Sequence, residues 1–255
     1  MSDRTLEQAA VDVLRKYGFK ADLIEETTSP TPDIRATDDE GISYLIEIKN
    51  RTVGWLDKAE PAWSESEFEV LHRVDSGGAS NTLSGVIEKA AEQLGVDNRP
   101  DTLRLIWFVV DPTDRDYHHK QIWQTVYGTQ IVIAKGRAPG EGFYLSPAAF
   151  VRWRNSLDGV ILGVLGGLFL NDLSPRYKAL KKSRLAQVCA EGIFDPASFK
   201  DSDTHYYLEP NELPPTRDNI ASRLASTYGI EVIALINLDR FSAATVVPDP
   251  PKAEE

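Results

Sequence analysis

The chain has 255 residues, of which 28 are basic and 39 acidic, so its net charge at pH 7 is −11. This length can bury a substantial core as one large domain or two small ones, and 42% hydrophobic residues is typical of a globular protein rather than a disordered one. The single cysteine, Cys189, excludes an intrachain disulfide framework. No signal-peptide pattern opens the sequence, and the longest apolar stretch, residues 159–170, is too short for a membrane helix, so we expect a cytoplasmic protein.

The charge is unevenly distributed along the chain. Residues 121–184 contain nine basic and three acidic residues, a net charge of +6, whereas the remainder is acidic. The overall charge argues against a protein that coats nucleic acid by charge alone. A local basic surface can still hold phosphates, because salt screens charges more than about 10 Å away. The alternative interpretation of this segment is a solvated helix face.

In the N-terminal half, the hydrophobic periodicity predicts a helix, three strands, a second helix and a buried central strand. Their predicted bounds are 5–17, 21–26, 33–37, 43–49, 82–94 and 103–110. The strands at 33–37 and 43–49 should form a hairpin, because an acidic turn with a glycine separates them. Residues 50–81 are predicted to be a long loop or a short helical insertion.

The C-terminal half is predicted to be mixed. Helices are expected at 121–127, 146–155, 174–188 and 219–228, and strands at 129–134, 142–145 and 230–237. Ser-Pro pairs start two of these helices, since Ser caps a helix and Pro suits its first turn. The Pro-rich, charged tail at 248–255 is predicted to be disordered.

This order of elements predicts a mixed sheet flanked by helices, an α/β or α+β fold. We expect a core at residues 1–115, with the insertion at about 50–81. Residues 116–247 should form an α/β region that extends this core and binds a substrate or partner.

Three charged residues on the predicted hairpin could carry chemistry. Asp33 begins one strand, and Glu47 and Lys49 end the next. Side chains two residues apart on a strand share a face, so Glu47 and Lys49 lie together and the hairpin brings Asp33 beside them. Two carboxylates suit Mg²⁺, which also binds substrate phosphate, and the Ile48 carbonyl is a further candidate ligand. Lys49 could orient or deprotonate an attacking water or neutralise charge in the transition state.

A purely structural interpretation of the same residues is available. Asp33 could cap a turn, and Glu47 and Lys49 could form a surface pair on a strand. However, the surrounding segment, residues 44–49, is otherwise strongly apolar, so a charged face there needs a reason.

These residues resemble a known family. A helix, then Pro32-Asp33 on a strand, thirteen intervening residues and Glu47-Ile48-Lys49 resemble the PD-(D/E)xK phosphodiesterase superfamily of restriction endonucleases, repair nucleases, Holliday-junction resolvases and RNA-cleaving toxins. The resemblance covers residues 5–111 and implies a restriction-endonuclease-like core. It also implies catalytic roles for Asp33, Glu47 and Lys49, with Mg²⁺ as the cofactor and Mn²⁺ as its substitute.

Two further residues acquire roles from the resemblance. Glu7 precedes Gly18-Phe19 on the first helix and would bind the metal or a metal-bound water; alternatively, it is a first-turn acid that favours the helix dipole. Gln93 occupies the place of a catalytic Gln on the second helix; alternatively, it is a helix-surface residue. Asp97 replaces the Tyr of the exonuclease branch, which favours an endonuclease.

The resemblance implies a metal-dependent DNA endonuclease of phage defence or DNA repair, acting as a homodimer or with a partner ATPase or second subunit. The basic segment should then contact the nucleic-acid backbone through Arg152, Arg154, Arg176, Lys178, Lys181 and Lys182. An RNA-cleaving nuclease of the same superfamily and a non-catalytic binding or assembly subunit are the alternatives. His118 and His119, with Asp114 and Asp116 nearby, could suggest a metal site, but adjacent histidines point apart and no third ligand is suitably spaced. A solvated loop is therefore predicted for the two histidines.

Overall fold

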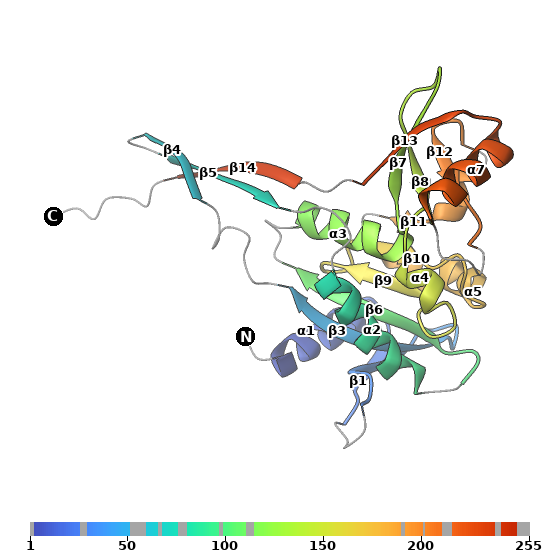
Figure 1. The fold of residues 1–255 in the computed structure, drawn as a ribbon. Coiled ribbons are helices and arrows are strands. Elements are labelled where there is room, and N and C mark those ends of the chain that lie inside the picture. Colours follow the sequence, from blue (N-terminus) through green and yellow to red (C-terminus); the bar gives the residue numbers. More distant parts are fainter. Residues whose placement is uncertain are drawn as a thin grey trace.

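A computed structural model describes residues 3–25, 30–51, 60–65, 68–75, 81–96, 99–110, 115–189, 192–200, 202–210, 216–237 and 241–248. Three sheets, of seven, four and three strands, and several helices make up this part of the chain (Figure 1). The fold is therefore of the mixed α+β class, as the sequence predicted. None of the described helices is long and apolar enough to cross a membrane.

The predicted order of the N-terminal elements is confirmed. They are α1 (Asp3–Lys16), β1 (Lys20–Leu23), β2 (Ile34–Thr37), β3 (Ser43–Arg51), α2 (Asn81–Gly95) and β6 (Leu103–Val110). The first helix ends as expected, because Gly18 has a φ of +91°, a conformation that ends helices and that residues with a Cβ rarely adopt. β2 and β3 form the predicted antiparallel hairpin, with Ile34 opposite Ile46.

The largest sheet has the strand order β1-β2-β3-β6-β9-β10-β11. Its last three strands are β9 (Gly159–Leu162), β10 (Gly167–Leu170) and β11 (Ile193–Phe194). β3 pairs in parallel with β6, and β6 in parallel with β9. The sheet thus takes strands from both sides of residue 115, and the C-terminal region extends the N-terminal core. The apolar stretch at 159–170 is the β9–β10 hairpin.

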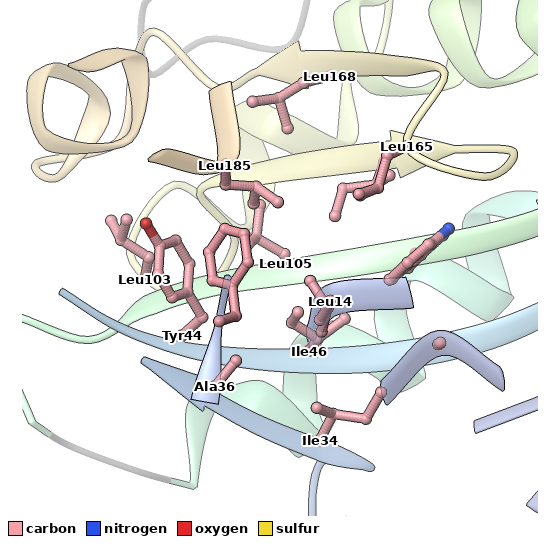
Figure 2. Close-up of a cluster of buried hydrophobic side chains, with 14 of the residues drawn as sticks. Leu14, Ile34, Ala36, Tyr44, Ile46, Leu103, Leu105, Leu165, Leu168 and Leu185 are labelled. Atoms are coloured by element: carbon pink, nitrogen blue, oxygen red, sulfur yellow. The ribbon is translucent and has the colours of Figure 1, made fainter. Parts of the chain in front are cut away.

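Both faces of the central strands are covered by apolar side chains. On one face, Leu14 of α1 packs with Ile46 of β3 and Leu105 of β6 (Figure 2). On the other face, Ile87 of α2 packs with Leu45 of β3. Residues 44–48 of β3 are all buried, so this strand passes through the centre of the protein.

The predicted loop or helical insertion at 50–81 is wrong for its described residues; residues 52–59, 66–67 and 76–80 lie outside the described part of the chain. β3 continues to Arg51, and β4 (Glu60–Glu65) and β5 (Phe68–Asp75) form a hairpin. β5 also pairs with β14 (Phe241–Pro248) in a three-stranded sheet. β14, the second partner of β5, lies far away in the sequence, so local periodicity could not show this pairing. Pro248 of the predicted tail ends β14, and residues 249–255 are outside the described part of the chain.

The four-stranded sheet confirms several predictions for the C-terminal half. It contains β12 (His205–Tyr207), β8 (Gly140–Phe143), β7 (Gln130–Ala134) and β13 (Val232–Ile236), in that order. Helix α7 (Arg217–Tyr228) packs beside β13. β8 ends earlier than predicted, because Tyr144 has a φ of 62° and leaves the extended conformation.

Three other helices differ from their predictions. α3 (Arg115–Tyr127) starts six residues before the predicted helix at 121–127. The helix expected at 146–155 is only α4 (Ala149–Arg152), which begins after Ala148 without a side-chain cap. The helix expected at 174–188 is divided into α5 (Tyr177–Lys182) and α6 (Arg184–Val188), because Ser183 is extended and its hydroxyl caps α6 by accepting the N–H of Ala186.

A buried carboxylate holds the amino ends of β6 and β9 together. Asp158 is fully buried and accepts hydrogen bonds from the Arg104 backbone N–H at 2.7 Å, from Arg176 Nε at 2.9 Å and from the Ser174 hydroxyl. Arg176 also donates to the Asn155 carbonyl. This network fixes the segment that leads into α5.

Replacing Asp158 by Ala should lower the free energy of unfolding by about 3–5 kcal/mol, because the Arg176 charge would stay buried without its partner. The measurement is urea unfolding followed by circular dichroism. Glu231→Ala, which breaks the exposed pair with Lys135, is the control and should change stability far less. Equal losses in the two variants would show that the Asp158 network does not stabilise the sheet.

Candidate active site

The structure brings Asp33, Glu47 and Lys49 together on the hairpin. The register of β2 and β3 pairs Ile34 with Ile46, so Asp33, one residue earlier, lies opposite Glu47. Asp33 Oδ2 accepts the backbone N–H of Ile48 at 2.7 Å. Lys49 Nζ donates to Glu47 Oε1 at 2.5 Å. The two carboxylates and the ammonium group therefore share one face of the β2–β3 hairpin.

Glu47 is an unusually buried acid. Its exposed fraction is 1%, and its strand neighbour Ile106 and the adjacent Leu45 on the same face are apolar. Oε1 is paired with Lys49, but Oε2 is buried without a hydrogen-bond partner in the described part of the structure. A buried polar atom of this kind carries a desolvation cost that a bound cation would offset.

Burial raises the pKa of both carboxyl groups, and neighbouring carboxylates add to each shift. Burial raises the pKa of Glu47 to about 7; the Lys49 hydrogen bond opposes this shift, and the nearby charge of Asp33 adds to it. Burial is also the largest cause of the raised pKa of Asp33; the Ile48 N–H opposes it and the charge of Glu7 increases it. The site thus holds more negative charge than its single lysine balances.

Glu7 lies beside this pair, on α1. It is only 8% exposed and forms an ion pair with Arg4 at 3.1 Å. It lines a small cavity of about 220 Å³ together with Leu6, Ile48, Lys49 and Asn50. The first helix therefore brings a third carboxylate to the edge of the site.

The donor set fits Mg²⁺. Asp33 and Glu47 supply hard oxygen atoms, and Mg²⁺ is usually held by one or two carboxylates, waters and substrate phosphates. Within the described part of the chain Oε2 of Glu47 has no hydrogen-bond partner, and this and the raised pKa values of both acids agree with a missing positive charge. Among the described residues, however, no group of three His, Cys, Asp or Glu side chains is arranged to hold one ion, so Glu7 does not complete a three-ligand site.

Gln93 supports the site from a distance. It lies on α2, and its Nε2 donates to the backbone carbonyl of Thr31 at 3.4 Å. Thr31 is two residues before Asp33, so this contact holds the segment that enters β2. The predicted ligand Ile48 meets Asp33 through its backbone N–H.

The predicted basic contacts are not gathered at the carboxylates. Arg176 is occupied by the buried Asp158, Lys181 donates to Asp195 at 2.6 Å, and Arg152 pairs with Glu88 at 2.5 Å. The remaining members of the set, Arg154, Lys178 and Lys182, are exposed. The segment before α5 is tied to the amino ends of β6 and β9, whereas Lys49 lies near the carboxyl end of β3. In Figure 1 the arrowheads of β3 and β9 point away from α5.

The solvated loop predicted for His118 and His119 is wrong, because both residues belong to α3. His118 is 7% exposed. The ring of His119 lies among aromatic rings, 4.9 Å from that of Phe194 and 5.2 Å from that of Phe169. The sequence did not reveal this burial because the helical pattern is weak before residue 121.

Sequence reasoning also missed Arg51, which ends β3 two residues after Lys49. The signal was present in the alternation of Glu47, Lys49 and Arg51. It was overlooked because the strand was predicted to end at residue 49.

Comparison of the chain with protein-family models, with curated proteins and with solved structures gave no match. The geometry and electrostatics of the site are therefore the guide to its function.

His118 should make the stability of the protein depend on pH. Burial, together with the charge of Arg51, lowers its pKa from 6.5 to about 4. Between these two pH values the unfolded chain binds a proton that the folded protein does not, so the free energy of unfolding falls as the pH drops from 6.5 towards 4. Between pH 7 and 4.5 the wild type should lose about 2 kcal/mol more than His118→Asn. Urea unfolding at both pH values measures the difference, and parallel pH profiles would contradict it.

Proposed function

We propose that this protein is a metal-dependent nuclease of the PD-(D/E)xK superfamily that hydrolyses phosphodiester bonds, with DNA as the favoured substrate. The observation that supports it most is Glu47, a buried acid beside Asp33 and Lys49 with one carboxylate oxygen left unpartnered among the described residues. A role in phage defence or DNA repair, as a homodimer or with a partner ATPase or second subunit, belongs to the same proposal.

A purely structural role explains these residues less well. Glu47 is not part of a surface pair, since its side chain is 2% exposed and that of Lys49 is 25% exposed. A buried ion pair is weak evidence for stability, because apolar residues of similar volume often serve as well or better. A charged pair at the centre of a sheet that is otherwise apolar therefore favours chemistry as its reason.

In this proposal, each residue has a distinct task. Asp33 and Glu47 would hold Mg²⁺, which supplies positive charge to the phosphate and a more acidic water. The Ile48 N–H fixes one oxygen of Asp33, so that carboxylate is oriented before any ligand binds. Lys49, partly exposed at the cavity, would orient the attacking water or place its charge beside the phosphate. The surrounding apolar side chains exclude bulk water from Glu47 and strengthen these interactions.

A non-catalytic binding or assembly subunit with a nuclease-like sheet is the second candidate. It is favoured by the absence, among the described residues, of three side chains arranged to ligate one metal ion. An RNA-cleaving nuclease would use the same residues, so only a substrate comparison separates it from the DNA enzyme.

Asp33→Asn and Lys49→Ala should each lower the rate of nucleic-acid cleavage at least about 100-fold, because they remove a metal ligand and the charge beside the phosphate. The assay uses labelled DNA and RNA of single- and double-stranded form, with Mg²⁺ or Mn²⁺. Asp22→Asn and Lys20→Ala, at exposed positions of β1, are matched controls and should cleave as the wild type does. Equal rates in the site variants and the wild type would refute the proposed site, and cleavage by none of the proteins would favour the non-catalytic subunit.

The exposed lysines of α5 should contribute to backbone binding if the basic segment has the predicted role. Lys178→Glu with Lys182→Glu should weaken DNA binding about tenfold and flatten its salt dependence, since each lost phosphate contact lowers the slope by about one. Lys181 is left unchanged because it pairs with Asp195.

Fluorescence anisotropy at several salt concentrations, without Mg²⁺, measures this binding. The control is Lys16→Glu with Lys89→Glu, the same charge change at exposed positions of α1 and α2. If both pairs weaken binding equally, total charge and not the α5 surface determines the affinity.

A further inference from the structure

A second cation lies on the same face of β3 as the candidate site. Side chains alternate along a strand, so Glu47, Lys49 and Arg51 share one face, and successive members are about 7 Å apart. Lys49 and Arg51 pair with Phe108 and Val110 of β6, at the carboxyl end of that strand. Arg51 is therefore the next charged residue beyond Lys49 on this face of β3.

The Arg51 side chain is held in place by α3. It is half-buried, and its Nη2 donates to Gln121 Oε1 at 3.5 Å. Gln121 Nε2 in turn donates to the Tyr117 hydroxyl at 2.8 Å. Gln121 is itself 6% exposed, so the amide that meets the guanidinium is fixed by its surroundings.

No carboxylate pairs with Arg51 among the described residues, in contrast to Arg176 and Lys181, each of which meets a buried Asp. Burial lowers the pKa of Arg51, and the Tyr117 phenol only partly opposes this. Arginine nevertheless stays protonated in proteins, so a half-buried positive charge remains, and its hydrogen bond among the described residues is to a neutral amide. Such a charge is costly to bury and is stabilised by an anion.

We propose that Arg51 binds a phosphate of the nucleic-acid backbone that neighbours the phosphate at Asp33, Glu47 and Lys49, with Gln121 as its positioning residue. This inference rests on the proposed nuclease function. The planar guanidinium presents parallel N–H groups that match two phosphate oxygens, which an ammonium group cannot do. α5 lies near the amino ends of β6 and β9, so it does not bring its positive charge to the carboxyl end of β3. Arg51 would supply positive charge to a phosphate bound there.

The test compares Arg51→Gln, Arg51→Lys and Gln121→Leu in the full-length protein. Affinity for a labelled duplex and for a labelled single strand is measured by anisotropy over a range of salt concentrations, with EDTA present. Cleavage is measured separately with Mg²⁺. Arg223→Gln, at a partly buried position of α7, is the matched control.

Arg51→Gln should raise Kd about tenfold and reduce the salt slope by about one, whereas Arg223→Gln should leave both unchanged. Arg51→Lys should keep the wild-type salt slope, because it keeps the charge, and should bind with intermediate affinity, because it loses the bidentate geometry. Gln121→Leu should raise KM more than it lowers kcat, since a misplaced Arg51 weakens substrate binding without touching the carboxylates.

The outcomes separate the two proposals. If Asp33→Asn abolishes cleavage while Arg51→Gln binds as tightly as the wild type, the role of Arg51 is overturned and the nuclease function stands. If Asp33→Asn cleaves normally, the proposed function fails, whatever Arg51 does. If Arg51→Gln does not fold, Arg51→Lys decides, and wild-type affinity in that variant overturns the bidentate contact. A wild-type protein that binds neither probe overturns the role of Arg51 as well.

Discussion

The central strand β3 places a carboxylate where a sheet normally holds only apolar side chains. Residues 44–48 are buried on both faces, and Glu47 is among them. Removing a carboxylate from water is expensive, and one lysine provides only part of the compensation, as the raised pKa of Glu47 indicates. The position of β3 between β2 and β6 determines which groups surround this charge: Asp33 from the hairpin partner, Lys49 from β3 itself and Glu7 from the helix packed beside the sheet.

The elements around the site show why this acid is tolerated. The parallel pairing of β3 with β6 and the two apolar layers on α1 and α2 stabilise the strand independently of Glu47. The Ile48 N–H and the Gln93 amide hold Asp33 and the segment before it. A rigid sheet with a destabilised charge on a central strand is suited to binding a cation or to catalysis, since a preformed site spends little energy on reorganisation.

Charge is distributed differently in space and along the sequence. The sequence places its positive segment at residues 121–184, but part of this charge neutralises buried acids, as Arg176 does for Asp158. The cation nearest to Lys49 on the strand is Arg51, which comes from the acidic N-terminal region. The net charge of a sequence segment is therefore a poor guide to how tightly a surface binds phosphate. It does not distinguish ion-paired side chains from those that face a ligand.

Local sequence patterns predicted much of the core. The period of 3.6 in α1 and α2, the alternation in β3 and the turn between β2 and β3 are properties of neighbouring residues, and they sufficed to bring Asp33, Glu47 and Lys49 to one place. The β5–β14 pairing, the burial of His118 and the pairing of Arg176 depend on residues that are not sequence neighbours, so no local pattern could show them.

Some features of the candidate site follow from local sequence, and others follow only from tertiary packing. The sequence by itself determined which charged residues share a face of β3, because side-chain alternation is a covalent property of an extended chain. Only the tertiary structure decided that Glu47 is buried with one oxygen unpartnered among the described residues, that Glu7 lies at the cavity and that α3 holds Arg51. Burial and long-range pairing arise from the packing of whole elements, and that packing sets the electrostatic environment of each group.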